Sequence, residues 1–311
     1  MNSTSWKICV TGRYNDEATA ELESGPHQIT YDKTQLADCD IAFGQPDPQI
    51  VIESNLRWVH LSSAGYTNYD NDTVREALHK RGAILTNSSS VYDEPCAQHA
   101  LAMMLAFARR LPQCWQDQTK QVWKSGPHRA ASQLLNQQTV LFLGYGAIGR
   151  RLEELLAPFG PVGLYALRRR ERGDESAAII YETDLDSFLP SADHVVNLLP
   201  ESPSTRGFMT RERFQQMQPG AHYYNIGRGA TTDQEALLEA LSSGHLGGAY
   251  LDVTSPEPLP PEHALWSAPN CFITPHSAGG HSNEDWRLVM HFLENLRRLQ
   301  ASEKLNDVVF A

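Results

Sequence analysis

The sequence predicts an α/β protein with two domains, each built around a parallel sheet. Short β-branched or apolar runs alternate with longer segments of helical periodicity, which is the pattern of parallel α/β architecture. The chain has 311 residues, and single hydrophobic cores stop growing near roughly 250–300 residues. We therefore expect two domains with a cleft between them.

The first third of the chain predicts the smaller sheet. Its strand candidates are residues 7–10, 40–44, 56–63 and 83–87. A long helix is expected to follow, with Asp93 as its N-cap and Pro112 at its end. Because the middle of this helix is apolar on nearly every side, we expect it to be buried between the domains.

The rest of the chain predicts a larger second sheet. Its strand candidates are residues 139–143, 163–167, 178–181, 194–199, 221–226, 247–253 and 271–274. The final segment, residues 283–299, has apolar residues at nearly helical spacing and is expected to return to the first domain. The expected domains are residues 1–95 with 285–311, and residues 96–284.

Composition excludes several classes of function. The formal charge of -11 argues against binding to nucleic acid or to anionic membranes. The five cysteines are scattered and odd in number, so we expect neither a disulfide framework nor a zinc site. The twelve histidines show no metal-ligand spacing, and no apolar run is long enough to span a bilayer. The sequence therefore predicts a cytoplasmic protein without a metal.

One glycine-rich stretch, TVLFLGYGAIGRRLEELLAPFG, predicts a dinucleotide site. A strand leads into Gly144-x-Gly146-x-x-Gly149, and the next helix has an apolar face. In such motifs the first glycine makes a tight turn, the second lets the backbone approach a pyrophosphate, and the third packs helix against strand. The free N–H groups of the helix N-terminus favour phosphate. An ordinary glycine turn would not need the strand and the amphipathic helix on either side.

The end of the next predicted strand indicates which dinucleotide. NAD-binding folds place Asp or Glu there to bind the ribose hydroxyls. In this chain Leu167 is followed instead by Arg168, Arg169 and Arg170. Guanidinium groups can pair with a 2′-phosphate, so we predict NADP(H) over NAD(H), with Arg168 the first contact and Arg169 the second. The alternative is a solvated basic loop.

Three later segments carry a family resemblance: NIGRG, LDVTSPEPLP and TPHSAGG. Their order and spacing resemble the D-isomer-specific 2-hydroxyacid dehydrogenase family, which includes glyoxylate/hydroxypyruvate reductases. The resemblance covers nearly the whole chain. It implies a Rossmann-like doubly wound parallel sheet domain inserted into a smaller flavodoxin-like α/β substrate domain. It also implies a homodimer, with Trp123 in the dimerisation arm.

The resemblance also implies roles for residues of these segments. Arg228 would bind the carboxylate and carbonyl oxygen of a 2-oxo acid, which suits a planar, permanently charged fork. His276 would protonate the carbonyl oxygen, and Glu257 would favour its imidazolium form. In the first domain, backbone N–H groups near Ala64 and Gly65 would bind the substrate carboxylate.

The remaining expected cofactor contacts also follow from the resemblance. Asp252 would lie near the nicotinamide amide, although a turn residue at a strand end is its plainer interpretation. Thr232 and Glu235 are expected to form a capping box, which is a purely structural feature. A further set of residues is expected to touch the dinucleotide. They are Gly144, Tyr145, Gly146, Ala147, Ile148, Gly149, Leu167, Arg168, Arg169, Leu199, Pro200, Thr205, Ile226, Gly227, Arg228, His276, Ala278 and Gly279.

Three alternatives compete with an oxidoreductase acting on a small 2-oxo acid. Formate dehydrogenases have Gln where this chain has Glu257, which counts against that activity. Phosphite dehydrogenases keep the Arg, Glu and His set, so the pattern leaves phosphite oxidation open. A corepressor-like protein that senses the dinucleotide also stays open, because a binding protein can retain a catalytic set.

Overall fold

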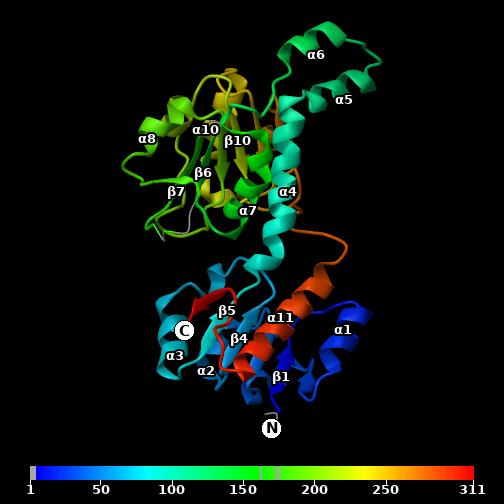
Figure 1. Ribbon diagram of the computed structural model, residues 1–311, viewed down its shortest axis with the longest axis vertical. Coiled ribbons are helices and arrows are strands. Elements are labelled where there is room, and N and C mark those ends of the chain that lie inside the picture. Colours follow the sequence, from blue (N-terminus) through cyan, green and yellow to red (C-terminus); the bar gives the residue numbers. More distant parts are fainter. Residues whose placement is uncertain (1–4, 162, 172, 174–175) are drawn as a thin grey trace. The chain divides into compact units, whose positions relative to one another are not determined.

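The computed structural model describes residues 5–161, 163–171, 173 and 176–311. The chain divides into two compact units, Met1–Tyr92 with Gly280–Ala311, and Asp93–Gly279 (Figure 1). These borders lie a few residues before the expected ones at 95/96 and 284/285. Both units are built around a parallel sheet, so the predicted α/β fold class is confirmed. The assignment of the smaller unit to substrate binding stays a prediction.

The smaller unit contains a six-stranded sheet in the order β13-β5-β4-β3-β1-β2. Its strands are β1 (Lys7–Val10), β2 (Gln28–Thr30), β3 (Ile41–Gly44), β4 (Trp58–Leu61), β5 (Ile84–Thr86) and β13 (Val308–Phe310). All pairs are parallel except β13 with β5. The sequence analysis missed β2 and β13, which lie at the two edges of the sheet and are buried only in part.

Helices cover both faces of this sheet. On one face, α1 (Asp16–Glu23) and α11 (Glu284–Gln300) pack against Ile8 and Val10. On the other, α2 (Pro48–Glu53) and α3 (Asp72–Lys80) pack against Cys9 and its neighbours. The alternation of β1 side chains between the two clusters is the period-two pattern of a strand buried on both sides.

The larger unit contains a seven-stranded, wholly parallel sheet in the order β12-β11-β10-β9-β6-β7-β8. Every strand falls on a predicted candidate. The strands are β6 (Thr139–Leu143), β7 (Gly163–Leu167), β8 (Ala178–Ile180), β9 (His194–Asn197), β10 (His222–Asn225), β11 (Gly248–Leu251) and β12 (Cys271–Ile273). The chain reverses its direction of winding between β6 and β9, which is where ligands bind in doubly wound sheets.

Helices of the larger unit also lie on both faces of its sheet. One face is covered by α8 (Leu185–Phe188), α9 (Arg211–Gln216) and α10 (Gln234–Ser242). Phe107, near the end of the long helix α4 (Ser89–Ala108), stacks on His222 of β10 at a ring-centroid distance of 4.9 Å. The helix α7 (Ala147–Leu156) directly follows the glycine turn.

Two predicted helix caps are wrong. Helix α4 begins at Ser89 and contains Asp93 and Pro95 within it. Its first amides are already satisfied, because the Ser89 N–H donates to Asn87 Oδ1 (3.2 Å) and the Ser90 N–H donates to Asp307 Oδ2 (2.8 Å). Asp307 is distant in sequence, so local reasoning could not find this cap.

The second wrong cap is that of α10. Its N-cap is Asp233, whose carboxylate accepts from the Ala236 N–H at 3.0 Å. Thr232 bonds instead to the hydroxyl of Tyr223 and the amide of Asn225. Pro112 also differs from expectation, because it lies in the first turn of a further helix, α5 (Leu111–Thr119), after a left-handed break at Arg110.

Candidate active site

Three predicted site residues follow three neighbouring strands of the larger unit. Arg228 comes after β10, Asp252 directly follows β11, and His276 comes after β12. These strands pair in parallel register, Asn225 with Leu251 and Leu251 with Ile273. Since adjacent strands lie roughly 4.8 Å apart, the three loops emerge together at the carboxyl edge of the sheet, where ligands bind in this architecture.

The structure brings His276 and Glu257 into contact. The His276 Nδ1 lies 2.6 Å from Glu257 Oε1, and the two side chains are 49% and 42% exposed. The segment that carries Glu257 is fixed by Gln234, which donates to the Ser255 carbonyl (2.8 Å) and accepts from the Ser255 N–H (2.7 Å). Because Nδ1 of His276 contacts Glu257, Nε2 is the ring nitrogen available to a ligand.

The other histidines at this sheet differ from His276 in their surroundings. His194 and His222 are packed into the sheet, and burial lowers the pKa of His194 to about 3 and that of His222 to about 4. Both rings therefore stay neutral at physiological pH, and the His194 nitrogens make structural contacts with the Tyr224 hydroxyl (2.9 Å) and Gln138 Oε1 (2.9 Å). Neither can act as a proton donor near neutral pH.

Asp252 supports the loop that carries His276. Its buried carboxylate accepts from the hydroxyl of Thr274 (2.6 Å), the Ser277 N–H (2.9 Å) and the Ala278 N–H (3.1 Å). The backbone carbonyl of Asp252 also accepts from the His276 N–H at 2.9 Å. This agrees with its plainer interpretation as a residue that organises a turn after the strand.

Arg228 is half-buried and folds back on its own loop. Its Nη1 donates to the Gly227 carbonyl at 2.7 Å. The next residue must be glycine, because a β-carbon at Gly229 would lie 1.9 Å from the carbonyl oxygen of Thr254. This close approach joins the loop after β10 to the loop after β11.

Two buried asparagines position these loops, and sequence reasoning missed both. Asn225 ends β10, accepts from the Gly227 N–H (3.0 Å) and donates to the Arg228 carbonyl (3.1 Å). Asn197 is its register partner at the end of β9 and accepts from the Leu199 N–H (3.1 Å). Their common place, a polar residue closing an apolar strand, was the signal available in the sequence.

The glycine turn has the geometry of a phosphate-binding loop. Gly144 has φ +89°, and a β-carbon there would lie 3.3 Å from the backbone of Leu198. At Gly149 a β-carbon would lie 3.2 Å from the ring of Tyr145, so helix and turn pack closely. At Gly146 it would meet nothing within 4 Å, and no side chain caps the α7 N-terminus. Open space beside the N–H groups of the first helical turn, which includes Ala147 and Ile148 and has no side-chain cap among the described residues, fits a pyrophosphate.

The side chain of Tyr145 packs inside the protein and does not face a ligand. Its ring is buried, and its hydroxyl donates to the carboxylate of Glu153 on α7. Burial raises the pKa of that carboxyl, with a smaller contribution from Glu154. Any contact of Tyr145 with a dinucleotide would therefore come from its backbone.

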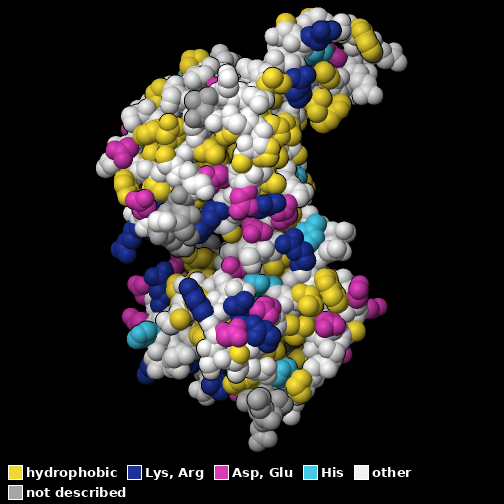
Figure 2. Space-filling model, in the orientation of Figure 1, with side chains coloured by type: hydrophobic (Ala, Val, Ile, Leu, Met, Phe, Trp, Pro, Cys, Tyr) yellow, Lys and Arg dark blue, Asp and Glu magenta, His cyan; other side chains and the backbone are white. Residues whose placement is uncertain are grey.

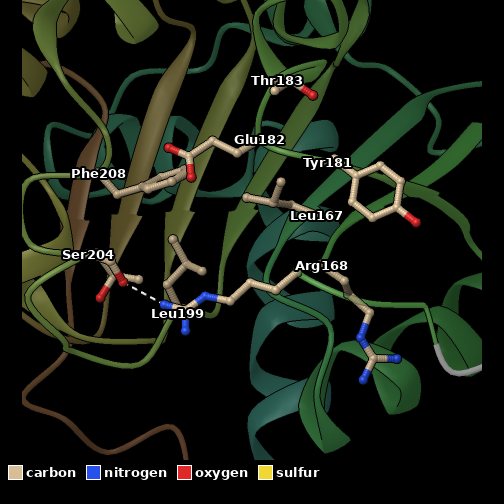
Figure 3. A pocket seen from close by; sticks show the side chains of 10 residues that line it. Leu167, Arg168, Tyr181, Glu182, Thr183, Leu199, Ser204 and Phe208 are labelled. Carbon is tan, nitrogen blue, oxygen red and sulfur yellow. Dashed lines mark hydrogen bonds between the residues drawn. The ribbon is translucent and has the colours of Figure 1, made fainter.

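The arginines after β7 line a pocket of about 300 Å³ (Figure 3). Arg169 Nη2 donates to the hydroxyl of Ser204 at 2.5 Å, and the Arg168 guanidinium carbon lies 5.9 Å from the centre of the Tyr145 ring. Five predicted contacts line this pocket: Leu167, Arg168, Arg169, Leu199 and Thr205. Five further lining residues were not predicted: Tyr181, Glu182, Thr183, Ser204 and Phe208.

The other predicted contacts are more scattered. The Pro200 carbonyl accepts from the Thr205 hydroxyl (2.6 Å), which shapes the loop after β9. Ile226 and Ala278 are buried, and Gly227 would place a β-carbon 2.6 Å from the Leu199 carbonyl oxygen. Ala64, held through its carbonyl by Asn87 (2.7 Å), lies in the other unit, as does Gly65; Gly279 is the last residue of the larger unit.

Fold and site together define a class of protein: an oxidoreductase with a dinucleotide-binding unit whose reactive groups gather at strand ends. The chain belongs to the D-isomer specific 2-hydroxyacid dehydrogenase family, whose model for the NAD binding domain matches residues 101–278. The predicted family and the predicted enzyme class, an NAD(P)-dependent oxidoreductase acting on CH–OH groups, are confirmed.

Similar proteins span most of the chain. A glyoxylate/hydroxypyruvate reductase B of Pectobacterium carotovorum is 34% identical over 245 residues, 78% of this chain and 75% of that protein. The mouse glyoxylate reductase/hydroxypyruvate reductase is 33% identical over 225 residues, 72% of this chain and 67% of the mouse protein. An NADPH-dependent glyoxylate/hydroxypyruvate reductase of Sinorhizobium meliloti, solved with NADP and sulfate, is 25% identical with a TM-score of 0.79 and 98% coverage of both chains.

The described part of the chain has neither a membrane-spanning helix nor a metal-binding cluster. No helix among the described residues is long and apolar enough to cross a membrane. Within the same part of the chain, no group of three or more His, Cys, Asp or Glu side chains could hold a metal ion.

Proposed function

We propose that the protein reduces a small 2-oxo acid, such as glyoxylate or hydroxypyruvate, to the 2-hydroxy acid with NADPH, and gives the D-isomer where the product is chiral. The observation that carries the proposal is the 2.6 Å contact between His276 Nδ1 and Glu257, beside the loop of Arg228 at the same sheet edge. The names of the Pectobacterium, mouse and Sinorhizobium relatives support this substrate class.

The chemistry follows from what each side chain can do. The bound dinucleotide supplies the hydride. Arg228 binds the substrate carboxylate and carbonyl oxygen through Nε and Nη2, since Nη1 is engaged with Gly227. His276 donates the proton on Nε2 to the carbonyl oxygen, and Glu257 stabilises the imidazolium that makes this donation possible. Ala64 and Gly65 offer backbone N–H groups to the same carboxylate.

The preference for NADPH rests on the pocket after β7. Arg168 and Arg169 supply positive charge there, and the Ser204 hydroxyl already lies 2.5 Å from Arg169, so the three groups could share one 2′-phosphate. Asp252 would reach the nicotinamide amide only if its carboxylate can serve a ligand while it holds the loop of His276.

A homodimer and a cytoplasmic location complete the proposal. Helices α5 and α6 (Ser125–Ala131) project from α4 as an arm (Figure 1), and hydrophobic side chains are visible on it in Figure 2. Trp123 is 92% exposed and Trp115 57% exposed. Exposing large aromatic side chains to water is unfavourable in free energy, and packing against a second copy of the chain would bury them.

The first experiment measures initial rates of glyoxylate and hydroxypyruvate reduction with NADPH and NADH. The native protein is compared with His276→Ala and with His79→Ala, an exposed histidine on α3 of the other unit. We expect turnover that prefers NADPH, falls at least about 100-fold in His276→Ala and is unchanged in His79→Ala. Phosphite oxidation without any reduction of oxo acids would favour the phosphite reaction, and NADPH binding without turnover would favour the sensor.

A further inference from the structure

The pocket after β7 has two ends of opposite charge. Ser204, which accepts a hydrogen bond from Arg169, lies at one end, and the carboxylate of Glu182 lies at the other (Figure 3). In this view the apolar side chains of Leu167 and Leu199 lie between the two ends, and Phe208 lies beside Glu182. The lining therefore suits a ligand that is anionic at one end, apolar in the middle and a hydrogen-bond donor at the other end.

Glu182 is held in place by an arginine outside the pocket lining. Its Oε1 lies 3.2 Å from Arg213 Nη2. Arg213 is itself fixed, because Nη1 donates to the Phe208 carbonyl (2.7 Å) and its guanidinium lies 4.0 Å over the Phe208 ring. Among the described residues, Oε2 of Glu182 has no hydrogen-bond partner, and the side chain is 64% exposed. A charged acceptor is thus oriented and accessible to a ligand.

Adenosine 2′-phosphate matches this arrangement of charge. Its phosphate pairs with the arginine end, and a carboxylate would repel that phosphate from the other end. The faces of the base are apolar and can contact Leu167 and Leu199. The exocyclic amino group of adenine is a donor at the edge of the base, and a carboxylate is an acceptor only.

We infer that Glu182 recognises the exocyclic amino group of adenine, so that the pocket distinguishes adenine from hypoxanthine. The inference rests on the proposed dinucleotide function and adds the residue that selects the base. Hypoxanthine has a carbonyl oxygen where adenine has the amino group, and this oxygen would face the Glu182 carboxylate without a proton between them.

The test compares NADP⁺ with its hypoxanthine analogue by calorimetry, and the two reduced forms by initial rates with glyoxylate. The variant is Glu182→Gln, whose amide can donate to the carbonyl of hypoxanthine or accept from adenine. The matched control is Glu239→Gln, since Glu239 is 63% exposed and pairs with Arg211 on the surface of α9 and α10. Both variants remove one exposed Glu–Arg ion pair.

We expect the native protein and Glu239→Gln to bind NADP⁺ about fivefold more tightly than the analogue, a modest ratio because the hydrogen bond is exposed to water. In Glu182→Gln the two ligands should bind within about twofold of each other. An unchanged ratio in Glu182→Gln, with NADPH turnover intact, would overturn the inference alone. If the native protein bound neither dinucleotide, both the inference and the proposed function would be wrong.

Discussion

Asp252→Asn tests whether the buried carboxylate organises the loop of His276. Asparagine can keep one oxygen for Thr274 and Ser277, but its amide then faces the Ala278 N–H, which donates to Oδ2 at 3.1 Å in the native protein. The Ala278 N–H also donates to Oδ1 at 3.2 Å, so the variant loses the Oδ2 branch of this bond and the negative charge that all three donors share, together worth about 1.5–3 kcal/mol. We expect the free energy of unfolding of the larger unit to fall by about 2 kcal/mol.

The assay is thermal unfolding combined with steady-state kinetics. For a unit of this size, about 2 kcal/mol corresponds to a fall in Tm of about 4–8 °C. The turnover number should fall about tenfold, because the loop of His276 loosens. The control is Asp233→Asn, in which the N-cap of α10 survives, since asparagine and aspartate cap helices about equally well. A native Tm with a raised KM for NADPH would refute the loop role and favour a contact with the nicotinamide amide.

Three further predictions concern the proposed site and the arm. Glu257→Gln should lower the turnover number for reduction about tenfold, because His276 loses the carboxylate that lies 2.6 Å from its Nδ1; a native turnover number would contradict this. Arg168→Ala and Arg169→Ala should each raise the KM for NADPH about tenfold and leave the KM for NADH within about twofold, as measured by initial rates. Equal effects on both cofactors would mean that the two arginines form a solvated loop and do not bind the 2′-phosphate. Trp123→Asp should convert a dimer to a monomer in sedimentation equilibrium, since the charge would be buried against the second copy; an unchanged mass would exclude this side chain from the interface.

Most elements could be predicted because their signals are local. The four central strands of the larger unit, β6, β9, β10 and β11, are largely buried apolar runs that can be recognised in the sequence. The failures occurred where a distant residue takes part. Helix α4 begins at Ser89 because Asp307 accepts from its first turn, and Thr232 is drawn from a capping role by Tyr223 and Asn225.

The residues of the candidate site also fall into two groups, those predicted from local motifs and those found only through tertiary contacts. The sequence by itself determined the family and the glycine turn, and it predicted Arg228, Glu257 and His276 as site residues, because motifs of fixed spacing follow known strands. Only the tertiary structure decided that Asp252 holds the His276 loop, that Asn197 and Asn225 brace the neighbouring loops, and that Glu182 and Ser204 join the arginine pocket. These residues come from separate strands, and parallel pairing alone makes them neighbours. No spacing along the chain encodes such a contact, because it depends on strand order and register.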